Sequence, residues 1–96
     1  MPITFDPAKN ARNVATRGLS FERVAELGWD TALLVEDDRR DYGERRFRVF
    51  AFLDGRLHIA VVTPRGEDLR VISLRRASHK EEKLYDSEHV RPGRAP

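Results

Sequence analysis

The sequence predicts an α+β fold in which two N-terminal helices pack on an antiparallel β-sheet and a third helix follows at the C-terminus. Two stretches with helix-capping residues precede residue 30, strand-like runs follow residue 45, and a capping motif lies near residue 78. The chain of 96 residues is long enough for one hydrophobic core. We therefore expect a single domain over residues 1–90 and a disordered tail over residues 91–96.

The first expected elements are a strand over residues 3–5 and a helix directly after it. Asp6 is a suitable N-cap, and Pro7 at the first helical position loses no intrahelical hydrogen bond. Gly18 is a suitable left-handed stop. The apolar residues at helical spacing are Ala8, Ala11, Val14 and Ala15, and the expected polar side carries Lys9, Arg12 and Asn13.

A second helix is expected to begin at the N-cap Ser20 and to end at Gly28. Leu19 before the cap and Val24 within the helix can form a hydrophobic staple. The apolar stripe of this helix consists of Phe21, Val24, Ala25 and Leu27. Trp29 follows at the exit, where we expect it to fill the core rather than to stack on nucleic acid.

A strand is then expected over residues 32–35, which are apolar throughout. Residues 36–41 are too charged to be buried, so they predict a loop that ends at Tyr42-Gly43.

A β-hairpin is the clearest local signal in the sequence. Asp54-Gly55 suits a two-residue turn in which both central residues have positive φ. This turn places Leu53 opposite Arg56, Ala51 opposite His58, and Val49 opposite Ala60. One face of the hairpin then carries Phe47, Val49, Ala51, Leu53, His58, Ala60 and Val62, and the other carries Arg46, Arg48, Phe50, Phe52, Leu57, Ile59, Val61 and Thr63.

Both faces of this hairpin are substantially apolar, but the two N-terminal helices can cover only one of them. The other is available to a ligand, a partner chain or the C-terminal helix. A turn over residues 64–68 leads into a last strand over residues 69–77. Ser78 and Glu81 have the spacing of a capping box, which predicts a helix that runs to about Glu88.

The net charge is only +2, but the charges are unevenly distributed. Residues 20–38 contain six acids and one base, whereas residues 39–77 contain ten bases and five acids. Every base in that second block is arginine, whose guanidinium forms paired contacts with phosphate. A solvated charged surface and a surface for an anionic partner are the two interpretations of this pattern.

No metal site or cofactor is expected. The chain has no cysteine, and His58, His79 and His89 share no ligand spacing. His58 lies in mid-strand and is interpreted as a structural histidine with its hydrogen bonds satisfied, while His79 should face solvent. The sequence shows no secretion signal and no apolar run long enough to span a bilayer, so we expect a cytoplasmic protein without membrane contact.

Clustered arginines can stabilise the pentacovalent phosphate of RNA cleavage without a metal ion, because charge-assisted donors act on the charge that develops. The 2′-OH of RNA supplies the nucleophile, so the protein needs only positioning, charge and proton transfer. On the residues alone, a non-catalytic binding module is the better interpretation and a metal-independent ribonuclease is the alternative.

Short motifs in a fixed order carry a resemblance to a known family. They are Phe5-Asp6 with Lys9 and Asn13; Gly18-Leu19-Ser20-Phe21; Asp41-Tyr42-Gly43-Glu44 with Arg46; Gly55-Arg56; Val61-Val62-Thr63 with Arg65-Gly66; Arg70-Val71-Ile72-Ser73-Leu74-Arg75-Arg76-Ala77; and Glu81 with Tyr85. With this order and spacing, the chain resembles the BrnT toxins of bacterial type II toxin–antitoxin systems over residues 3–85.

The resemblance implies a RelE-like fold and RNA cleavage that arrests translation. It also implies a BrnA-like antitoxin whose ribbon–helix–helix part binds DNA, so that the protein meets DNA only through its partner. We expect a 2:2 complex without ribonuclease activity. The sequence departs from the family at Thr16-Arg17-Gly18, where Lys-His-Gly is common, and at Val62, where a tyrosine is usual.

The resulting hypothesis is an endoribonuclease toxin that acts without metal. Arg46 and Arg75 are the candidates for phosphate and transition-state contacts, and Lys9 and Arg17 are expected to close the site from the first helix. The candidate RNA-binding residues are Arg48, Arg65, Arg70, Ser73, Arg76 and Lys80. The alternative is a catalytically degenerate toxin that binds its antitoxin and regulates the operon, since Arg17 stays protonated and is a poor base.

Overall fold

The computed structural model describes residues 2–89, so the tail expected over residues 91–96 lies outside the described residues. Its elements in chain order are β1 (Ile3–Phe5), α1 (Pro7–Arg17), the 3₁₀ helices η1 (Phe21–Glu26) and η2 (Trp29–Thr31), β2 (Leu33–Glu36), β3 (Phe47–Leu53), β4 (Arg56–Arg65), β5 (Asp68–Arg76) and α2 (His79–His89). The predicted α+β class is confirmed.

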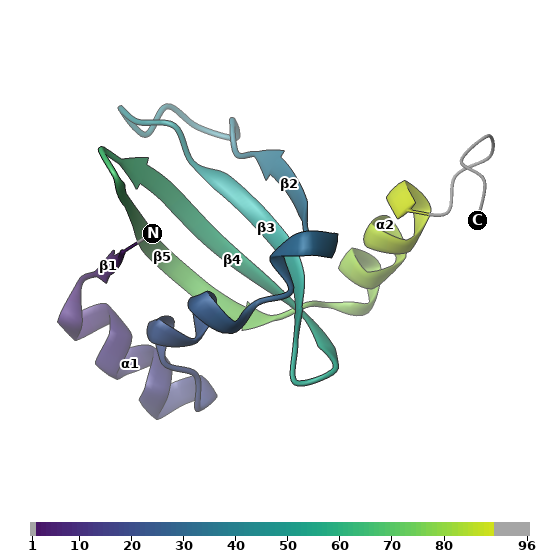
Figure 1. Ribbon diagram of the computed structural model, residues 1–96, viewed down its shortest axis with the longest axis horizontal. Helices are drawn as coiled ribbons and strands as arrows, with labels where there is room; N and C mark the ends of the chain where they lie inside the picture. The colour runs from purple at the N-terminus through teal and green to yellow at the C-terminus, as the bar shows by residue number, and fades with distance from the viewer. Residues whose placement is uncertain (1, 90–96) are drawn as a thin grey trace.

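The five strands form one sheet in the order β1-β5-β4-β3-β2 (Figure 1). Strands β2 to β5 are antiparallel neighbours, as expected for strands joined by short loops. The expectation of a wholly antiparallel sheet is wrong, because β1 pairs with β5 in parallel. No hairpin sets the direction of β1, whose partner lies more than sixty residues further along the chain.

The β3–β4 hairpin forms as predicted. Asp54 and Gly55 have φ values of 52° and 76°, and the register pairs Leu53 with Arg56 and Ala51 with His58. Within the hairpin, Asp54 and Gly55 are the residues with positive φ, so the chemistry of this turn determines which hairpin residues share a face.

The β4–β5 connection is tighter than predicted. The ladder continues to Arg65 and Asp68, which leaves a two-residue turn in place of the expected turn over residues 64–68. A β-bulge then shifts the register: Val62 pairs with Val71 and Val61 pairs with Ser73. The extra residue of the bulge keeps Ser73 and Arg75 on the face of Val61 and Ile59.

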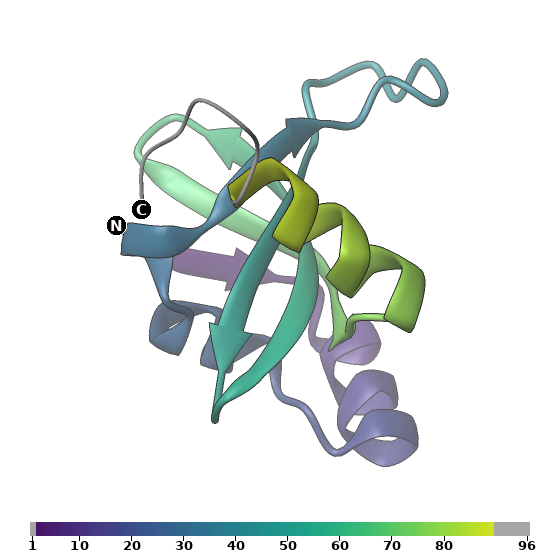
Figure 2. The same cartoon turned by 90° about the vertical axis from the view of Figure 1, so that its right-hand side faces the viewer.

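Both faces of the sheet are covered within the described residues, and the C-terminal helix is the one of the three expected occupants that covers the second face. Helix η1 packs on one face, here called the η1 face, in a core of Phe21, Val24, Leu27, Val49, Ala51, Leu53, Ala60, Val62, Val71 and Leu74. Helix α2 packs on the other, the α2 face, where Tyr85 joins Phe50, Leu57 and Ile59. Figure 2 shows α2 in front of the sheet, with α1 and η1 below and behind it.

Helix α1 begins and ends as predicted, with Asp6 accepting the backbone N–H of Ala8 and Gly18 in the left-handed conformation. The residue of α1 that faces the protein differs from the prediction. Val14 is 45% exposed, whereas Asn13, assigned to the polar side, is the buried residue of the helix. Alanines contribute little apolar area, so hydrogen bonds determine which side faces the protein.

The second predicted helix is the 3₁₀ helix η1, with Ser20 as its N-cap. Val24 is fully buried and Leu19 packs against the same core, which agrees with the predicted staple. Trp29 does not fill the core, because it is 38% exposed and donates its indole N–H to the carbonyl of Val24.

Candidate functional site

The strand registers place most of the predicted arginines on the α2 face. Arg48 pairs with Val61, Arg70 with Thr63, and Arg75 with Ile59, and these residues alternate with the η1-face core. Arg76 pairs with His58 on the η1 face instead. Lys80 is exposed on α2. The predicted arginines therefore share a sheet, but they form separate groups upon it.

Arg46 and Arg65 form the first group through Glu44. Arg46 Nε lies 3.2 Å from Glu44 Oε2, and Arg65 Nη2 lies 3.1 Å from Glu44 Oε1. Partial burial opposes ionisation of Glu44, but the hydrogen bonds from Arg65 and Arg46 outweigh it and hold its pKa below the usual value. The Arg46 guanidinium also stacks on Tyr42, 4.2 Å from the ring centroid. Both guanidiniums are thus already paired.

Arg48 lies between this group and the core of the α2 face. Its guanidinium is 5.6 Å from the centroid of the Phe50 ring. Its Nε is buried and has no hydrogen-bond partner, the one such side-chain nitrogen or oxygen among the described residues. The side chain of Arg70 forms no hydrogen bond or ion pair within residues 2–89, so the guanidiniums of Arg48 and Arg70 both retain donors for a ligand.

Arg75 is held by Glu81 of α2. Arg75 Nη1 and Nη2 donate to the two carboxylate oxygens at 2.7 and 2.8 Å, and the backbone N–H of Ser78 also donates to Glu81. The Arg75 hydrogen bonds, with the help of Ser78 and against the effect of burial, lower the pKa of Glu81 to about 2. The pair is therefore ionised, and it ties the end of β5 to the start of α2.

Arg46 and Arg75 are not neighbours, although they lie on one face. Thr63 donates to the carbonyl of Arg45 and marks the Arg46 end of β4. Arg75 lies opposite Ile59, four residues along β4 from Thr63, which corresponds to roughly 13 Å. The structure thus places the two predicted catalytic arginines at opposite ends of a cationic track.

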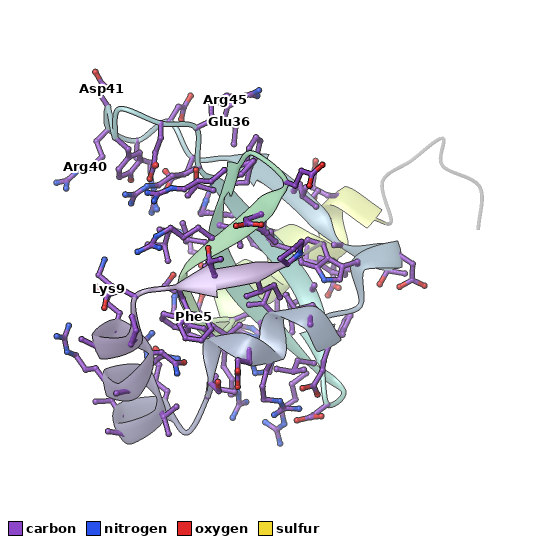
Figure 3. The ribbon with its side chains drawn as sticks, turned by 60° about the vertical axis from the view of Figure 1, so that its left-hand side comes forward. Phe5, Lys9, Glu36, Arg40, Asp41 and Arg45 are labelled. Atoms are coloured by element: carbon purple, nitrogen blue, oxygen red, sulfur yellow. The ribbon has the colours of Figure 1, made fainter. Side chains whose placement is uncertain are left out.

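The loop before β3 adds a buried ion pair that charge composition did not predict. Asp37 is buried, and both its carboxylate oxygens accept from Arg39 at 2.8 Å. These hydrogen bonds hold the pKa of Asp37 well below its usual value in spite of burial. Figure 3 shows Arg40 and Asp41 projecting from this loop, and Glu36 beside its partner Arg45.

Helix α1 supplies a cationic rim along β5. A cleft of about 240 Å³ is lined by Lys9, Arg12, Asn13, Thr16, Arg17, Phe21, Ile72 and Ser73. Lys9 projects outward from α1 in Figure 3, and Arg17 donates to Asn13 at 3.3 Å. Lys9, Arg17 and Ser73, predicted separately from distant parts of the sequence, are thus brought together.

A second cleft, of about 420 Å³, lies where α1 ends beside the start of β4 and the end of β5. Its lining consists of Arg17, Leu19, His58, Arg75 and Arg76. This is the place where the largest number of predicted site residues meet around one space with a histidine. His58 was interpreted as structural, and its Nδ1 does form a hydrogen bond with the carbonyl of Arg56 at 2.8 Å.

The neighbours of His58 at this cleft depend on the β4–β5 register. That register contains a bulge, and it places Arg76 directly opposite His58. Arg17 reaches the same cleft from α1, more than forty residues earlier in the chain. In the sequence, this arrangement could be inferred only from the pairing of the last strand with residues 56–63. The bulge shifts that pairing by one residue, which the sequence does not indicate.

Among residues 2–89, no three His, Asp or Glu side chains cluster in a way that could hold a metal ion. In the same part of the chain, no helix is long and apolar enough to cross a membrane.

A family model described as "Ribonuclease toxin, BrnT, of type II toxin-antitoxin system" matches residues 5–81. The match covers most of the chain, including α1, strands β2 to β5, the lining of both cationic clefts and Glu81. No curated protein matches the sequence significantly.

Proposed function

The chain belongs to the BrnT family of ribonuclease toxins of type II toxin–antitoxin systems, and we propose that it is an endoribonuclease that cleaves RNA without a metal ion and so inhibits translation in the cytoplasm. The observation that carries this proposal is the 420 Å³ cleft in which guanidiniums from α1 and β5 meet. Guanidiniums form charge-assisted hydrogen bonds to phosphate, and such donors stabilise charge that develops in a transition state.

The substrate supplies the nucleophile in this reaction. The 2′-OH attacks the adjacent phosphorus and the bond to the 5′ oxygen breaks, which leaves a 2′,3′-cyclic phosphate. Arg17 and Arg75 contact the phosphate in the cleft, and Lys9 guides the strand along α1. The route continues over the α2 face through Ser73, Arg70 and Arg48 toward the Glu44 group, where Arg46 and Arg65 contact phosphates further along the strand. Arg76 lines the cleft from β5, and Lys80, exposed on α2, is a further proposed RNA contact.

Glu81 keeps Arg75 in place for this role. A bidentate carboxylate fixes the plane of the guanidinium. Nη1 also donates to the carbonyl of Arg76 at 3.2 Å, so the N–H of Nε and the second N–H of Nη2 remain available for phosphate oxygens. An arginine that is already oriented loses less side-chain entropy when the substrate binds. This arrangement supports Arg75 as a phosphate contact more directly than its charge alone.

A protein antitoxin is the partner that this family implies. We propose that one of its segments fills the apolar groove on the η1 face, which has a volume of about 550 Å³ and is lined by Ile3, Ala25, Trp29, Leu34, Phe47, Val62, Pro64 and Leu69. Leu34 is 55% exposed at the edge of the sheet. This groove and the arginines of the α2 face lie on opposite sides, so a separate, acidic segment is needed to cover the phosphate site.

The antitoxin is further proposed to be BrnA-like, with a ribbon–helix–helix part that binds DNA, and to form a 2:2 complex in which the ribonuclease is silent. We also propose that the fold is of the RelE-like type. The support for this assignment is the antiparallel group β2 to β5 with helices on both faces.

Two observations favour the alternative of a degenerate toxin that only binds its antitoxin and regulates the operon. Arg17 stands where the family commonly has histidine, and Glu44 and Glu81 already neutralise Arg46, Arg65 and Arg75. The alternative predicts an intact groove on the η1 face and no cleavage of RNA by the purified protein.

Induced expression in a bacterial host tests the proposal against this alternative. The toxin proposal predicts growth arrest and RNA fragmentation when the chain is expressed alone, and relief of both when the neighbouring open reading frame is expressed with it. Expression of Arg75→Ala at an equal level is the control. Normal growth and intact RNA with the wild-type chain would contradict the ribonuclease and support the degenerate toxin.

A further inference from the structure

His58 is held in one tautomer by the backbone. Its Nδ1 lies 2.8 Å from the carbonyl oxygen of Arg56, and a carbonyl oxygen can only accept a hydrogen bond. Nδ1 must therefore carry the proton, and in the neutral ring Nε2 is the free base. The side chain is only 5% exposed, so packing between β3 and β5 fixes the orientation of the ring.

The free nitrogen of His58 reaches the cleft. Nε2 has no hydrogen-bond partner among the described residues, yet it is not one of the fully enclosed nitrogens, of which Arg48 Nε is the single case there. His58 lines the cleft of about 420 Å³. A buried ring that lines a cleft and has one nitrogen without a partner among the described residues differs from an ordinary structural histidine, in which both nitrogens are satisfied.

The surroundings of His58 are suited to a phosphodiester. The charged groups that face the cleft are Arg17 from α1 and Arg75 and Arg76 from β5; Leu19 is apolar, and Ala51 opposite on β3 is uncharged. Glu81 of α2 lies behind Arg75 and is bound to it. No carboxylate lines the cleft, and guanidiniums do not give up their protons, so His58 is the one group there that can accept a proton.

We propose that His58 is the general base of the RNA cleavage proposed above, on which this inference rests. Nε2 takes the proton of the 2′-OH as O2′ bonds to phosphorus. The bond from phosphorus to the 5′ oxygen then breaks, and the leaving oxygen takes a proton from water. The imidazolium afterwards returns its proton to water, so the enzyme is restored and no oxidant, reductant or metal ion is consumed.

The decisive variant is His58→Asn. The asparagine amide nitrogen occupies the position of Nδ1 and can still donate to Arg56, but the side chain has no group at Nε2. His79→Asn is the matched control, since His79 is exposed and lies outside the cleft. Thermal unfolding of both variants checks that the fold is kept, and His58→Gln serves as a second variant if His58→Asn does not fold.

The readout is single-turnover cleavage of an RNA oligonucleotide between about pH 5 and pH 9. We expect the wild-type rate to rise with pH, because a general base acts only in its unprotonated form. His58→Asn should lose about 10²- to 10³-fold in rate and lose this pH dependence, whereas His79→Asn should match the wild type. Imidazole added to the buffer should restore part of the rate only in His58→Asn.

Two results would overturn the assignment of His58 and leave the ribonuclease proposal standing. One is a wild-type rate that does not change between about pH 5 and pH 9. The other is a His58→Asn protein with the rate and pH profile of the wild type. A wild-type protein that does not cleave RNA at any pH would overturn both.

Discussion

Asn13 attaches α1 to the free edge of β5. Its Nδ2 donates to the carbonyls of Leu19 and Leu74 at 2.9 and 3.0 Å, and the side chain is buried. Asn10, one turn earlier, acts as an acceptor instead of a donor: its Oδ1 accepts from the backbone N–H of Phe21 at 2.7 Å. These two amides position Lys9 and Arg17 beside β5.

Asn13→Asp should destabilise the protein by about 2–3 kcal/mol, because a carboxylate oxygen replaces the donor in front of two carbonyls and leaves buried polar groups unpaired. Asn10→Asp is the matched control, since it keeps the accepting oxygen, and it should change stability by less than about 0.5 kcal/mol. Urea unfolding of the two variants measures the difference. Equal effects would show that α1 is held by something other than the Asn13 amide.

Arg75→Ala should raise the barrier to cleavage by about 2–4 kcal/mol, which is the loss observed when one donor to a developing anion is removed. Arg46→Ala should raise it by less, because Arg46 is proposed to contact a phosphate further along the strand. Arg75 is the stronger candidate, because it lines the cleft with His58. Arg40→Ala is the matched control: Arg40 projects from a loop and forms no ion pair among the described residues.

The cleavage rates of the three arginine variants at low and moderate salt distinguish a specific phosphate contact from a non-specific attraction for RNA. Arg40→Ala should lose only a weak attraction for RNA that salt screens. Equal losses in all three would mean that the arginines form an unspecific cationic surface.

At this scale the sequence predicted residues whose role is set by their neighbours in the chain, such as Asp6, Gly18, Ser78 and Asp54. It did not predict the burial of Asn13 or Asp37, which depends on contacts made by the fold, and a polar side chain gives no sign of burial in the sequence. The mid-strand position of His58 opposite Ala51 was predicted, and His58 is buried there. The prediction for Trp29 was also wrong, because Trp29 was expected to fill the core. Its indole N–H donates to the backbone, and its ring stays half-buried.

Helix α2 begins with a reciprocal capping box. Ser78 N–H donates to Glu81, and Glu81 N–H donates to Ser78 Oγ at 3.2 Å, as predicted from the sequence. Arg75 at the end of β5 forms an ion pair with Glu81 and so links the last strand to this cap. One carboxylate thus holds together the end of β5, the start of α2 and a proposed phosphate contact.

Glu81→Gln should therefore lower stability at neutral pH by roughly 1–2 kcal/mol, a figure discounted because Arg75 is partly exposed. The pKa of Glu81 is lowered from its usual 4.5 to about 2. The stabilisation is present above pH 4.5 and is lost as pH falls from 4.5 toward 2, because protons then bind preferentially to the unfolded chain.

Unfolding measured from pH 7 to pH 2 checks this pH dependence. The loss between pH 4.5 and pH 2 should be smaller in Glu81→Gln than in the wild type. Glu82→Gln is the control in the same helical turn, since Glu82 is half-exposed and makes only a long contact with His79. A parallel loss in Glu82→Gln would assign the effect to the helix dipole instead of to Arg75.

The apolar groove on the η1 face provides a test of the partner. Leu34→Asp places a charge on its exposed edge and should weaken binding of the antitoxin at least tenfold, because a desolvated carboxylate would face an apolar segment. Leu84→Asp is the control, since Leu84 is similarly exposed on α2 at the other face. Co-purification and calorimetric titration with the neighbouring gene product measure both. Unchanged binding of Leu34→Asp would remove the groove from the complex.

Turns and helix ends that depend on neighbouring residues could be predicted from the sequence. Strand pairings and helix orientations that depend on distant segments could not. The Asp54-Gly55 turn fixed the β3–β4 register, and caps fixed both α-helices. The parallel pairing of β1, the bulge in β5 and the inward side of α1 depend on contacts between distant segments. Arg46, Ser73 and Arg75 share the α2 face, and a two-residue turn followed by a bulge replaces the turn expected over residues 64–68.

In the whole molecule the sheet separates two kinds of surface. The η1 face carries the apolar groove between β1 and β2, and the α2 face carries Arg48, Arg70 and Arg75 beside α2. The cleft with His58 lies at the end of β5 that β1 does not cover, beside α1. Contact with a partner and contact with phosphate are therefore assigned to different parts of one small domain.

Cleavage of an RNA oligonucleotide that carries a single 2′-deoxy nucleotide at the cut site tests the central claim most directly. The purified protein, in excess chelator, should cleave the all-ribose strand and leave a 2′,3′-cyclic phosphate or its hydrolysis product, as read by mass spectrometry of the fragments. The deoxy strand should remain intact, because it lacks the attacking oxygen. Cleavage of the deoxy strand at the same position, or complete inhibition by the chelator, would contradict this mechanism.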